Sequence, residues 1–377
     1  MSKIVQLQAL HEKNGHLTEF AGFKLPLWFT GIIPESLAVR NAAGIFDVSH
    51  MGRVLIRGRD SRELVDRFTT NDVASLTVGQ GQYSLMCNPN GGIKDDVVVF
   101  HVQGEDYLIV YNAGNRLKDY NWILENSKGS NVDLQDVSDE VAMFAVQGPR
   151  AREIVQSISS VDLSSIPRFG CNWTELSGKK TLVTRTGYTG EDGFEVYVWD
   201  SPLNDPINAH TVWGDLVEAG KPLGIQLCGL GARDLLRLEA GLCLYGNEMD
   251  ENTNPYEAKL SFAVKLHKDF IGKERLLQVK EKGTPRVRVG LVMENRVIPR
   301  HGFEITMSGR SLGTVTSGTL SPILNTGIAM GYVEKEAAKE GSLLDVQIRG
   351  RLEKAKIAKP PFYDTNVYGY ARKPQRA

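Results

Sequence analysis

The sequence predicts an α+β protein that ends in an all-β module. Helical and strand patterns alternate quickly as far as residue 282, and a glycine-rich turn joins two of the strands into a hairpin. Beyond residues 281–285, EKGTP, helical periodicity stops and only short strand-like runs remain. With 377 residues the chain is too long for one ordinary hydrophobic core, so we expect two or three domains.

The first elements alternate between helix and strand. Residues 34–43 have helical character that ends at Gly44, and residues 53–57 alternate like a strand. A second helix follows, and Asp60 is its expected N-terminal cap because Glu63 stands three residues later in a capping-box pattern. This alternation without long helices favours an α+β unit.

A hairpin is the clearest local prediction. Strands at residues 82–88 and 93–102 are expected to pair across the turn PNGG, so the sheet should be antiparallel. The other elements expected before the change in character are strands at 106–112, 141–147, 180–185 and 194–199, and helices at 115–126, from Pro149 onward, at 206–219, 232–241 and 273–282.

The C-terminal part reads as a β-barrel or jelly-roll-like module. Its short apolar runs are separated by turn residues and show no helical period. They lie at residues 287–293, 303–307, 312–317, 328–333 and 344–348. We therefore place a domain boundary between residues 284 and 285.

The bulk composition excludes several classes of protein. Lys plus Arg (44) nearly cancels Asp plus Glu (45), which gives no field that would favour nucleic acid or an anionic membrane. No apolar run is long enough to span a bilayer, and no secretory signal or transit peptide is visible. The four cysteines, Cys87, Cys171, Cys228 and Cys243, form no C-x-x-C pair. We expect reduced thiols in the cytoplasm, or in the mitochondrial matrix of a eukaryote.

Two adjacent acids are the most informative feature of the chain. Asp95 and Asp96 follow the glycine turn in NPNGGIKDDVVV and open an apolar strand, where an unpaired buried charge is costly. Side chains alternate along a strand, so the two carboxylates should point to opposite faces, and one can enter a cavity. The ordinary alternative is that the two acids only form a charged edge of the hairpin.

Four further segments resemble the T-protein of the glycine cleavage system. They are FDVSHMG at residues 46–52, RTGYTGEDGFEV at 185–196, GLGARDLLRLEAGLCLYG at 229–246 and MDENTNPYEAKL at 249–260. The resemblance runs in the same order from AGFKLPLWF at 21–29 to KPPFY at 359–363, so it covers nearly the whole chain.

This resemblance implies a three-domain cloverleaf around a central folate channel. Two interleaved antiparallel α+β domains would occupy residues 1–284, and the β domain residues 285–377. The implied activity is a tetrahydrofolate-dependent aminomethyl transfer. Its acceptor substrate is tetrahydrofolate, its protein partner is lipoylated H-protein, and no metal, nucleic acid or membrane takes part.

The family pattern also implies site residues. Asp96 matches the catalytic carboxylate, and the folate-binding positions match Tyr83, Asn112, Tyr188, Glu195 and Arg233. A carboxylate such as Glu195 can accept hydrogen bonds from the N–H groups of a pterin, and aromatic rings can clamp it. Each side chain also has a structural explanation: core packing for the tyrosines, a turn cap for Asn112, a surface position for Glu195, and an ion pair with Asp234 or Glu239 for Arg233.

Two functional alternatives remain open on these residues alone. One is a folate-dependent demethylase of the same fold, and the other is a non-catalytic folate-binding maintenance protein. A dinucleotide site is disfavoured because GLGARD, at residues 229–234, lacks the third glycine of the G-x-G-x-x-G pattern. His50 and His101 have no companion at a metal-ligand spacing.

Overall fold

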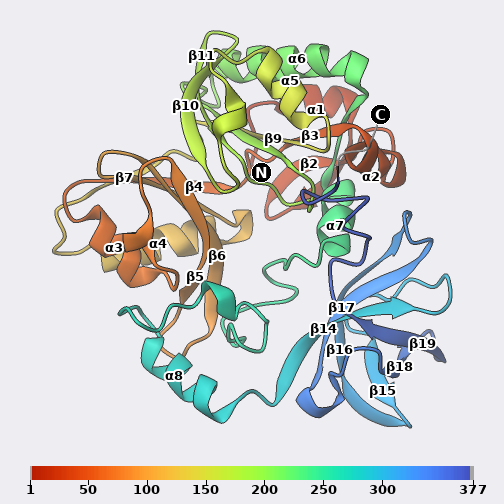
Figure 1. Ribbon diagram of the computed structural model, residues 1–377. Coiled ribbons are helices and arrows are strands. Elements are labelled where there is room, and N and C mark those ends of the chain that lie inside the picture. Colours follow the sequence, from red (N-terminus) through yellow and green to blue (C-terminus); the bar gives the residue numbers. More distant parts are fainter. Residues whose placement is uncertain (1, 374–377) are drawn as a thin grey trace.

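A computed structural model describes residues 2–373 as three units, with the last at the lower right of Figure 1. The first unit holds a five-stranded sheet in the order β5-β6-β7-β4-β8, and the second a six-stranded sheet in the order β10-β11-β12-β9-β3-β13. The third is a closed barrel, β14-β17-β16-β15-β18-β19. The predicted α+β class with a C-terminal barrel is confirmed.

The elements of the first unit are β4 (Gly52–Arg57), α3 (Ser61–Phe68), β5 (Gln80–Cys87), β6 (Ile93–Gln103), β7 (Asp106–Tyr111), α4 (Arg116–Asn126) and β8 (Asp133–Asp136). The second unit contains α1 (Gln8–Asn14), α2 (Ile32–Asn41), β3 (Ala43–Asp47), β9 (Ala142–Gln147), α5 (Ala151–Ser157), β10 (Cys171–Leu176), β11 (Lys179–Thr184), β12 (Gly193–Val198), α6 (Ile207–Gly220) and β13 (Ile225–Leu227), with β1 (His16–Phe20) and β2 (Phe23–Trp28) as a separate hairpin. Then come α7 (Leu230–Glu239) and α8 (Lys273–Lys282), followed by the barrel strands β14 (Arg286–Met293), β15 (Glu304–Met307), β16 (Arg310–Ser321), β17 (Thr326–Glu334), β18 (Leu343–Ile348) and β19 (Arg351–Ala358).

The predicted hairpin forms between β5 and β6 and carries the two acids. Its turn closes because the side-chain carbonyl of Asn88 accepts hydrogen bonds from the backbone N–H groups of Asn90 and Gly92, at 2.9 and 3.1 Å. Gly91 takes a φ of +79°, which residues with a side chain rarely adopt. The turn thereby fixes the register of the hairpin, in which Met86 pairs with Asp95 and Leu85 pairs with Asp96.

The capping role expected for Asp60 is wrong. Asp60 does stand at the N-terminus of α3, but its side chain makes no capping hydrogen bond there. Instead its Oδ2 accepts a hydrogen bond from the backbone N–H of Asn131, at 2.7 Å, which lies on a distant loop. A long-range partner has replaced the local one.

The two α+β units are interleaved along the chain. β3 precedes the whole first unit, yet it pairs with β9 and β13, which follow it. The pairing of β3 with β13 is parallel, so the second sheet is not purely antiparallel as the family resemblance implied. The two sheets face each other across a shared core that includes Phe100 and Leu108 from one unit and Leu182 and Tyr197 from the other.

The barrel closes through a strand that sequence patterns did not predict. β19 pairs with both β14 and β18. Its sequence, RLEKAKIA, alternates charged and apolar residues, and only Ala355 and Ile357 in it are buried. The barrel begins at Arg286, and the division of the chain between residues 284 and 285 stays a prediction.

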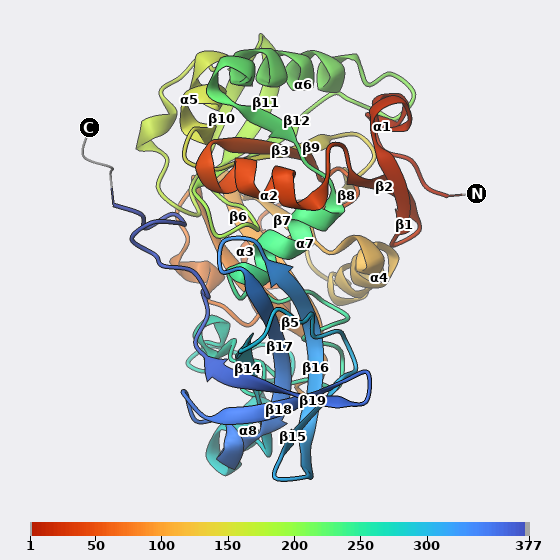
Figure 2. The ribbon, with the colours of Figure 1, turned by 90° about the vertical axis from the view of Figure 1, so that its right-hand side faces the viewer.

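Helix α7 joins the barrel to the rest of the molecule, as Figure 2 shows. It packs against α2 on one side and against β16 on the other. Arg237 of α7 is 1% exposed, and it donates hydrogen bonds to Glu248 and to the hydroxyl of Ser317, each at 2.8 Å. The second oxygen of Glu248 accepts from Thr316 at 2.6 Å. This buried ion pair therefore locks the barrel onto α7.

We expect Glu248→Ala to destabilise the protein by about 3–5 kcal/mol, because it leaves the Arg237 guanidinium buried without its main counter-charge. The matched control is Asp234→Ala. Asp234 also pairs with Arg237, but its side chain is 54% exposed, so its loss should cost less than about 1 kcal/mol. Urea unfolding of both variants measures the difference, and equal losses would contradict the structural role of Glu248.

No helix within residues 2–373 has the length and apolar character needed to cross a bilayer. All four cysteines are buried, and none of them forms a disulfide in the described residues.

Candidate active site

Asp95 and Asp96 point to opposite faces of β6, as strand alternation predicted. Asp95 is fully buried on the face covered by α4, where it meets Asn112 and Asn115. Asp96 is half-buried on the opposite face, which it shares with Tyr83 of β5. The two carboxyl groups therefore have different environments although they are adjacent in sequence.

Two hydrogen-bond donors hold the carboxyl group of Asp96. The hydroxyl of Tyr83 donates to Oδ2 at 3.1 Å, and the Asn112 side-chain amide donates to Oδ1 at 2.8 Å. Desolvation by burial and the nearby charge of Asp95 raise the pKa of Asp96 to about 7, against the lowering effect of these two bonds. A carboxyl group that titrates near neutral pH can exchange a proton with a substrate.

Asn112 does not cap a turn with its side chain. Its Nδ2 donates to Asp95 Oδ1 and to Asp96 Oδ1, each at 2.8 Å, so one amide bridges the two acids from the end of β7. The orientation of this amide follows from the network, because only N–H groups can face two carboxylates. Asn112 therefore fixes the geometry of the acid pair.

Arg233 of α7 stacks on Tyr188. Its guanidinium carbon lies 4.6 Å from the ring centroid, a cation–π contact. The Tyr188 hydroxyl donates to the backbone carbonyl of Cys243. The alternative ion pairs of Arg233 are wrong, because Asp234 pairs with Arg237 and Glu239 pairs with Arg40. Within residues 2–373 the Arg233 side chain has no carboxylate bound to it and remains half-buried.

Glu195 lies inside β12 rather than on the surface. It sits between Thr184 of β11 and Ala145 of β9 and is 8% exposed. Its carboxyl group accepts a hydrogen bond from the hydroxyl of Thr186. Burial raises the pKa of Glu195, whereas Thr186 and the positive charge of Arg233 oppose that rise. A buried carboxylate with one protein donor keeps lone pairs for a ligand.

Electrostatic coupling joins these residues into one cluster. Burial is the main cause that raises the pKa of Tyr83 and of Tyr188, and the charge of Asp96 raises both further. The positive charge of Arg233 opposes the rise in the pKa of Tyr188 and in the pKa of Glu195. Hydrogen bonds, the stacking contact and these charges therefore link all six residues that the family pattern selected, from β5, β6, the position after β7, the loop before β12, β12 and α7.

Sequence patterns missed several neighbours of the cluster. Phe262 stacks on Tyr83 with ring centroids 5.8 Å apart and remains 61% exposed. Thr186, which binds Glu195, lies only two residues before Tyr188 and could have been found in the same motif. Asp119 of α4 is also fully buried beside Asp95. The only signal for it in the sequence is its spacing of four residues from Asn115, which places the two side chains on the same face of a helix.

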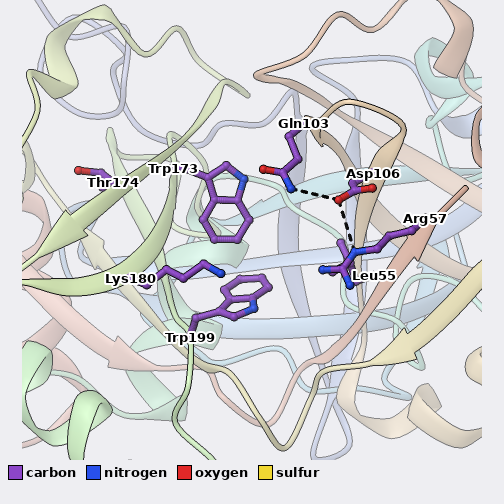
Figure 3. A pocket seen from close by; sticks show the side chains of 8 residues that line it. All are labelled: Leu55, Arg57, Gln103, Asp106, Trp173, Thr174, Lys180 and Trp199. Atoms are coloured by element: carbon purple, nitrogen blue, oxygen red, sulfur yellow. Dashed lines mark hydrogen bonds and ion pairs between the residues drawn. The ribbon is translucent and has the colours of Figure 1, made fainter.

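A cavity lies elsewhere in the molecule. It measures about 280 Å³ and is shown in Figure 3. Arg57, Gln103 and Asp106 line it from the first unit, and Trp173, Lys180 and Trp199 from the second. Gln103 is seven residues beyond Asp96 on β6, roughly 23 Å along the strand. The acid cluster is therefore the better candidate for chemistry, because it holds the Asp96 carboxyl group, whose pKa is raised to about 7.

The fold has two interleaved α+β units and a C-terminal barrel, and the site has a carboxyl group with a pKa raised to about 7 among aromatic and cationic side chains, as expected of an enzyme that transfers protons. Family models agree with this description. The GCVT N-terminal domain matches residues 7–268, and the glycine cleavage T-protein C-terminal barrel domain matches residues 286–364.

Similar proteins cover nearly the whole chain. A probable aminomethyltransferase of Pyrococcus horikoshii is 42% identical over 99% of this chain and 100% of its own. The aminomethyltransferase of Bacillus subtilis is 44% identical over 93% of this chain and 96% of its own. The crystal structure of the glycine cleavage system aminomethyltransferase T from Bartonella henselae has a TM-score of 0.90 at 32% identity and covers 98% of this chain and 99% of its own.

The chain belongs to the glycine cleavage T-protein family and is an enzyme of the aminomethyltransferase class. The resemblance inferred from the four sequence segments is thus confirmed. Within residues 2–373 no group of three or more His, Cys, Asp or Glu side chains is placed to hold a metal ion.

Proposed function

We propose that this enzyme transfers a one-carbon unit from the aminomethyl group on the lipoyl sulfur of H-protein to tetrahydrofolate. The products are 5,10-methylenetetrahydrofolate, ammonia and dihydrolipoyl H-protein. The observation that carries the proposal is the half-buried Asp96 carboxyl group, with a pKa near 7, held between Tyr83 and Asn112. The named aminomethyltransferases among its relatives supply the reaction class.

The folate would bind across the cluster. Glu195 offers its free lone pairs to the N–H groups of the pterin, since Thr186 uses only one of its acceptor sites. Arg233 keeps guanidinium N–H groups for ring nitrogens or a carbonyl, because its known contact is the face of Tyr188. Tyr83 and Tyr188 supply flat apolar walls, and Asn112 keeps its side-chain oxygen free of the two acids.

The transfer requires two protons to move. Two carbon–nitrogen bonds form between the methylene carbon and the folate nitrogens, while its bonds to sulfur and to the departing nitrogen break. The two N–H protons of the folate end on the thiol of dihydrolipoyl H-protein and on ammonia. Asp96, as a carboxylate, accepts a proton from a folate nitrogen and stabilises the cationic iminium-like intermediate. Tyr83 and Asn112 hold the carboxylate in place for this step.

The test is a one-carbon assay with aminomethylated H-protein and tetrahydrofolate. We expect stoichiometric release of ammonia that depends on both substrates. A folate-dependent demethylase would instead turn over a methylated donor without H-protein, and a non-catalytic folate-binding protein would release no ammonia. The reduced cysteines and the bacterial and archaeal relatives support a cytoplasmic location as part of this proposal.

The transfer rate should depend on pH through Asp96. Its pKa near 7 means that it is mostly protonated at pH 6, so the single-turnover rate there should be about tenfold below the plateau reached above pH 8. The contribution of Asp96 to the stability of the fold should instead decrease as the pH rises. The folded pKa lies above the ordinary value near 3.9, so the Asp96 contribution to stability is lost as pH rises through about 7.

Rates of ammonia release from pH 5.5 to 9 measure this profile. Asp96→Asn is the control, since it should lack the acidic limb altogether. A limb that persists in that variant belongs to another group and contradicts the assignment.

A further inference from the structure

The acid that faces away from the substrate side is the centre of a buried network. Asp95 accepts the backbone N–H of Asn112 on Oδ2 at 2.9 Å. Its Oδ1 accepts the side-chain amides of Asn112 and Asn115, at 2.8 and 2.9 Å. A carboxylate has about four acceptor sites, so three N–H donors leave one site on Oδ2. Three N–H donors therefore converge on this one carboxyl group.

Asp119 lies close to Asp95. It is on α4, is fully buried, and its carboxyl group is within hydrogen-bonding reach of Asp95. Neither of its oxygens receives a hydrogen bond from a side chain or backbone group in residues 2–373. Lys118 Nζ is 3.9 Å from Asp119 Oδ1, which is beyond hydrogen-bonding distance, and it donates instead to Lys94 and Tyr245.

Two buried carboxylates in contact cannot both be ionised, so the pair must share one proton. The proton belongs on Asp119, because three N–H groups already donate to Asp95 whereas Asp119 accepts no hydrogen bond, and N–H donors bind a carboxylate more strongly than a carboxylic acid. Burial and the charge of Asp95 together raise the pKa of Asp119 to about 11, and the positive charges of Lys118 and Lys94 oppose this rise.

We propose that Asp119 is a positioning residue for the transfer, a neutral carboxylic acid that donates a hydrogen bond to Asp95 and thereby holds Asn112 against Asp96. The chain of contacts is continuous: Asp119 orients Asp95, Asp95 fixes both the backbone and the side chain of Asn112, and Asn112 donates to Asp96. The inference rests on the proposed role of Asp96 but concerns Asp119 and Asp95, which lie on the face of β6 turned away from the substrate side.

Comparing Asp119→Asn with Asp119→Ala tests whether the rate depends on the hydrogen-bond donor at this position. The asparagine amide keeps the size and an N–H donor toward Asp95, so its single-turnover rate should stay within about threefold of the parent. The alanine removes the donor and frees Asn112, and a misplaced catalytic group should lower the rate by about tenfold or more. Rescue by the neutral donor is the signature of a positioning role, since it would fail if Asp119 acted as a charge.

Ile123→Ala is the matched control. Ile123 is fully buried one turn further along α4, and it packs in the core on the same side of the sheet. Its truncation should lower Tm without lowering the rate at temperatures where the variant is folded. If Asp119→Ala loses no more rate than Ile123→Ala, or if Asp119→Asn is as impaired as Asp119→Ala, the proposal is wrong.

A substrate-free measurement completes the test. Infrared difference spectra of parent minus Asp119→Asn at neutral pH should show the C=O stretch of one protonated carboxyl group. The absence of that band would overturn the proposal even if Asp119→Ala does not fold. Because this measurement needs no substrate, it is independent of the proposed transfer; that reaction fails separately, if Asp96→Asn turns over normally.

Discussion

Asp96→Asn is expected to lower the single-turnover rate of ammonia release by about 10²- to 10⁴-fold, the usual loss when a general base is removed. The amide should keep the local geometry. Its oxygen can accept from Asn112, and its NH₂ can donate to the hydroxyl oxygen of Tyr83, which can act as either donor or acceptor. The variant therefore removes basicity and little else.

Stability distinguishes this loss from unfolding. Since burial raises the pKa of Asp96 to about 7, its ionised form is disfavoured in the folded state, and the neutral amide should be at least as stable at pH 8. Asp106→Asn is the control, because Asp106 lies on the neighbouring strand and pairs with Arg57 far from the cluster. A small and equal rate loss in both variants would refute Asp96 as the catalytic carboxylate.

Glu195→Gln should weaken the binding of tetrahydrofolate by about 1.5–3 kcal/mol, or roughly 10- to 150-fold in Kd. The glutamine oxygen can still accept from Thr186, but its NH₂ would face a pterin N–H that the carboxylate would have accepted. Calorimetric titration with tetrahydrofolate measures the change. The fold should persist, because burial already disfavours the charge of Glu195.

Glu175→Gln provides the comparison. Glu175 lies in β10 of the same sheet with its side chain exposed, so its affinity for folate should equal that of the parent. If Glu195→Gln is folded and binds folate as tightly as Glu175→Gln, the pterin does not lie against Glu195. In that case the cluster can still perform the chemistry at Asp96, but the orientation of the folate in it must differ.

Much of the fold was predictable because its signals are local. The turn at Asn88–Gly92 needs a side-chain acceptor and a glycine with positive φ, and both stand in the sequence. The alternation of side chains along a strand is enough to place Asp95 and Asp96 on opposite faces of β6. The change from helical to strand patterns near residue 285 likewise indicated the barrel, although β19 was missed because its exposed face is charged.

The candidate site was only partly predictable. Motif resemblance selected the six residues, yet nothing in their spacing places Glu195 of β12 near Arg233 of α7 or Tyr83 near Phe262. The ordinary explanations for Glu195 and Arg233 failed on contacts that only the folded chain reveals, namely burial between two strands and stacking on Tyr188.

The sequence by itself determined the hairpin, the opposite facing of the two acids and the all-β ending, since turn chemistry and periodicity act over a few residues. Tertiary structure alone decided the interleaving of β3 with β9 and β13, the hydrogen bond from Asn131 to the side chain of Asp60, and the pairing of Asp119 with Asp95. These contacts join residues far apart in the chain or on different elements. Their energies depend on burial and on which partner packing brings within reach, and local sequence patterns carry no information about either.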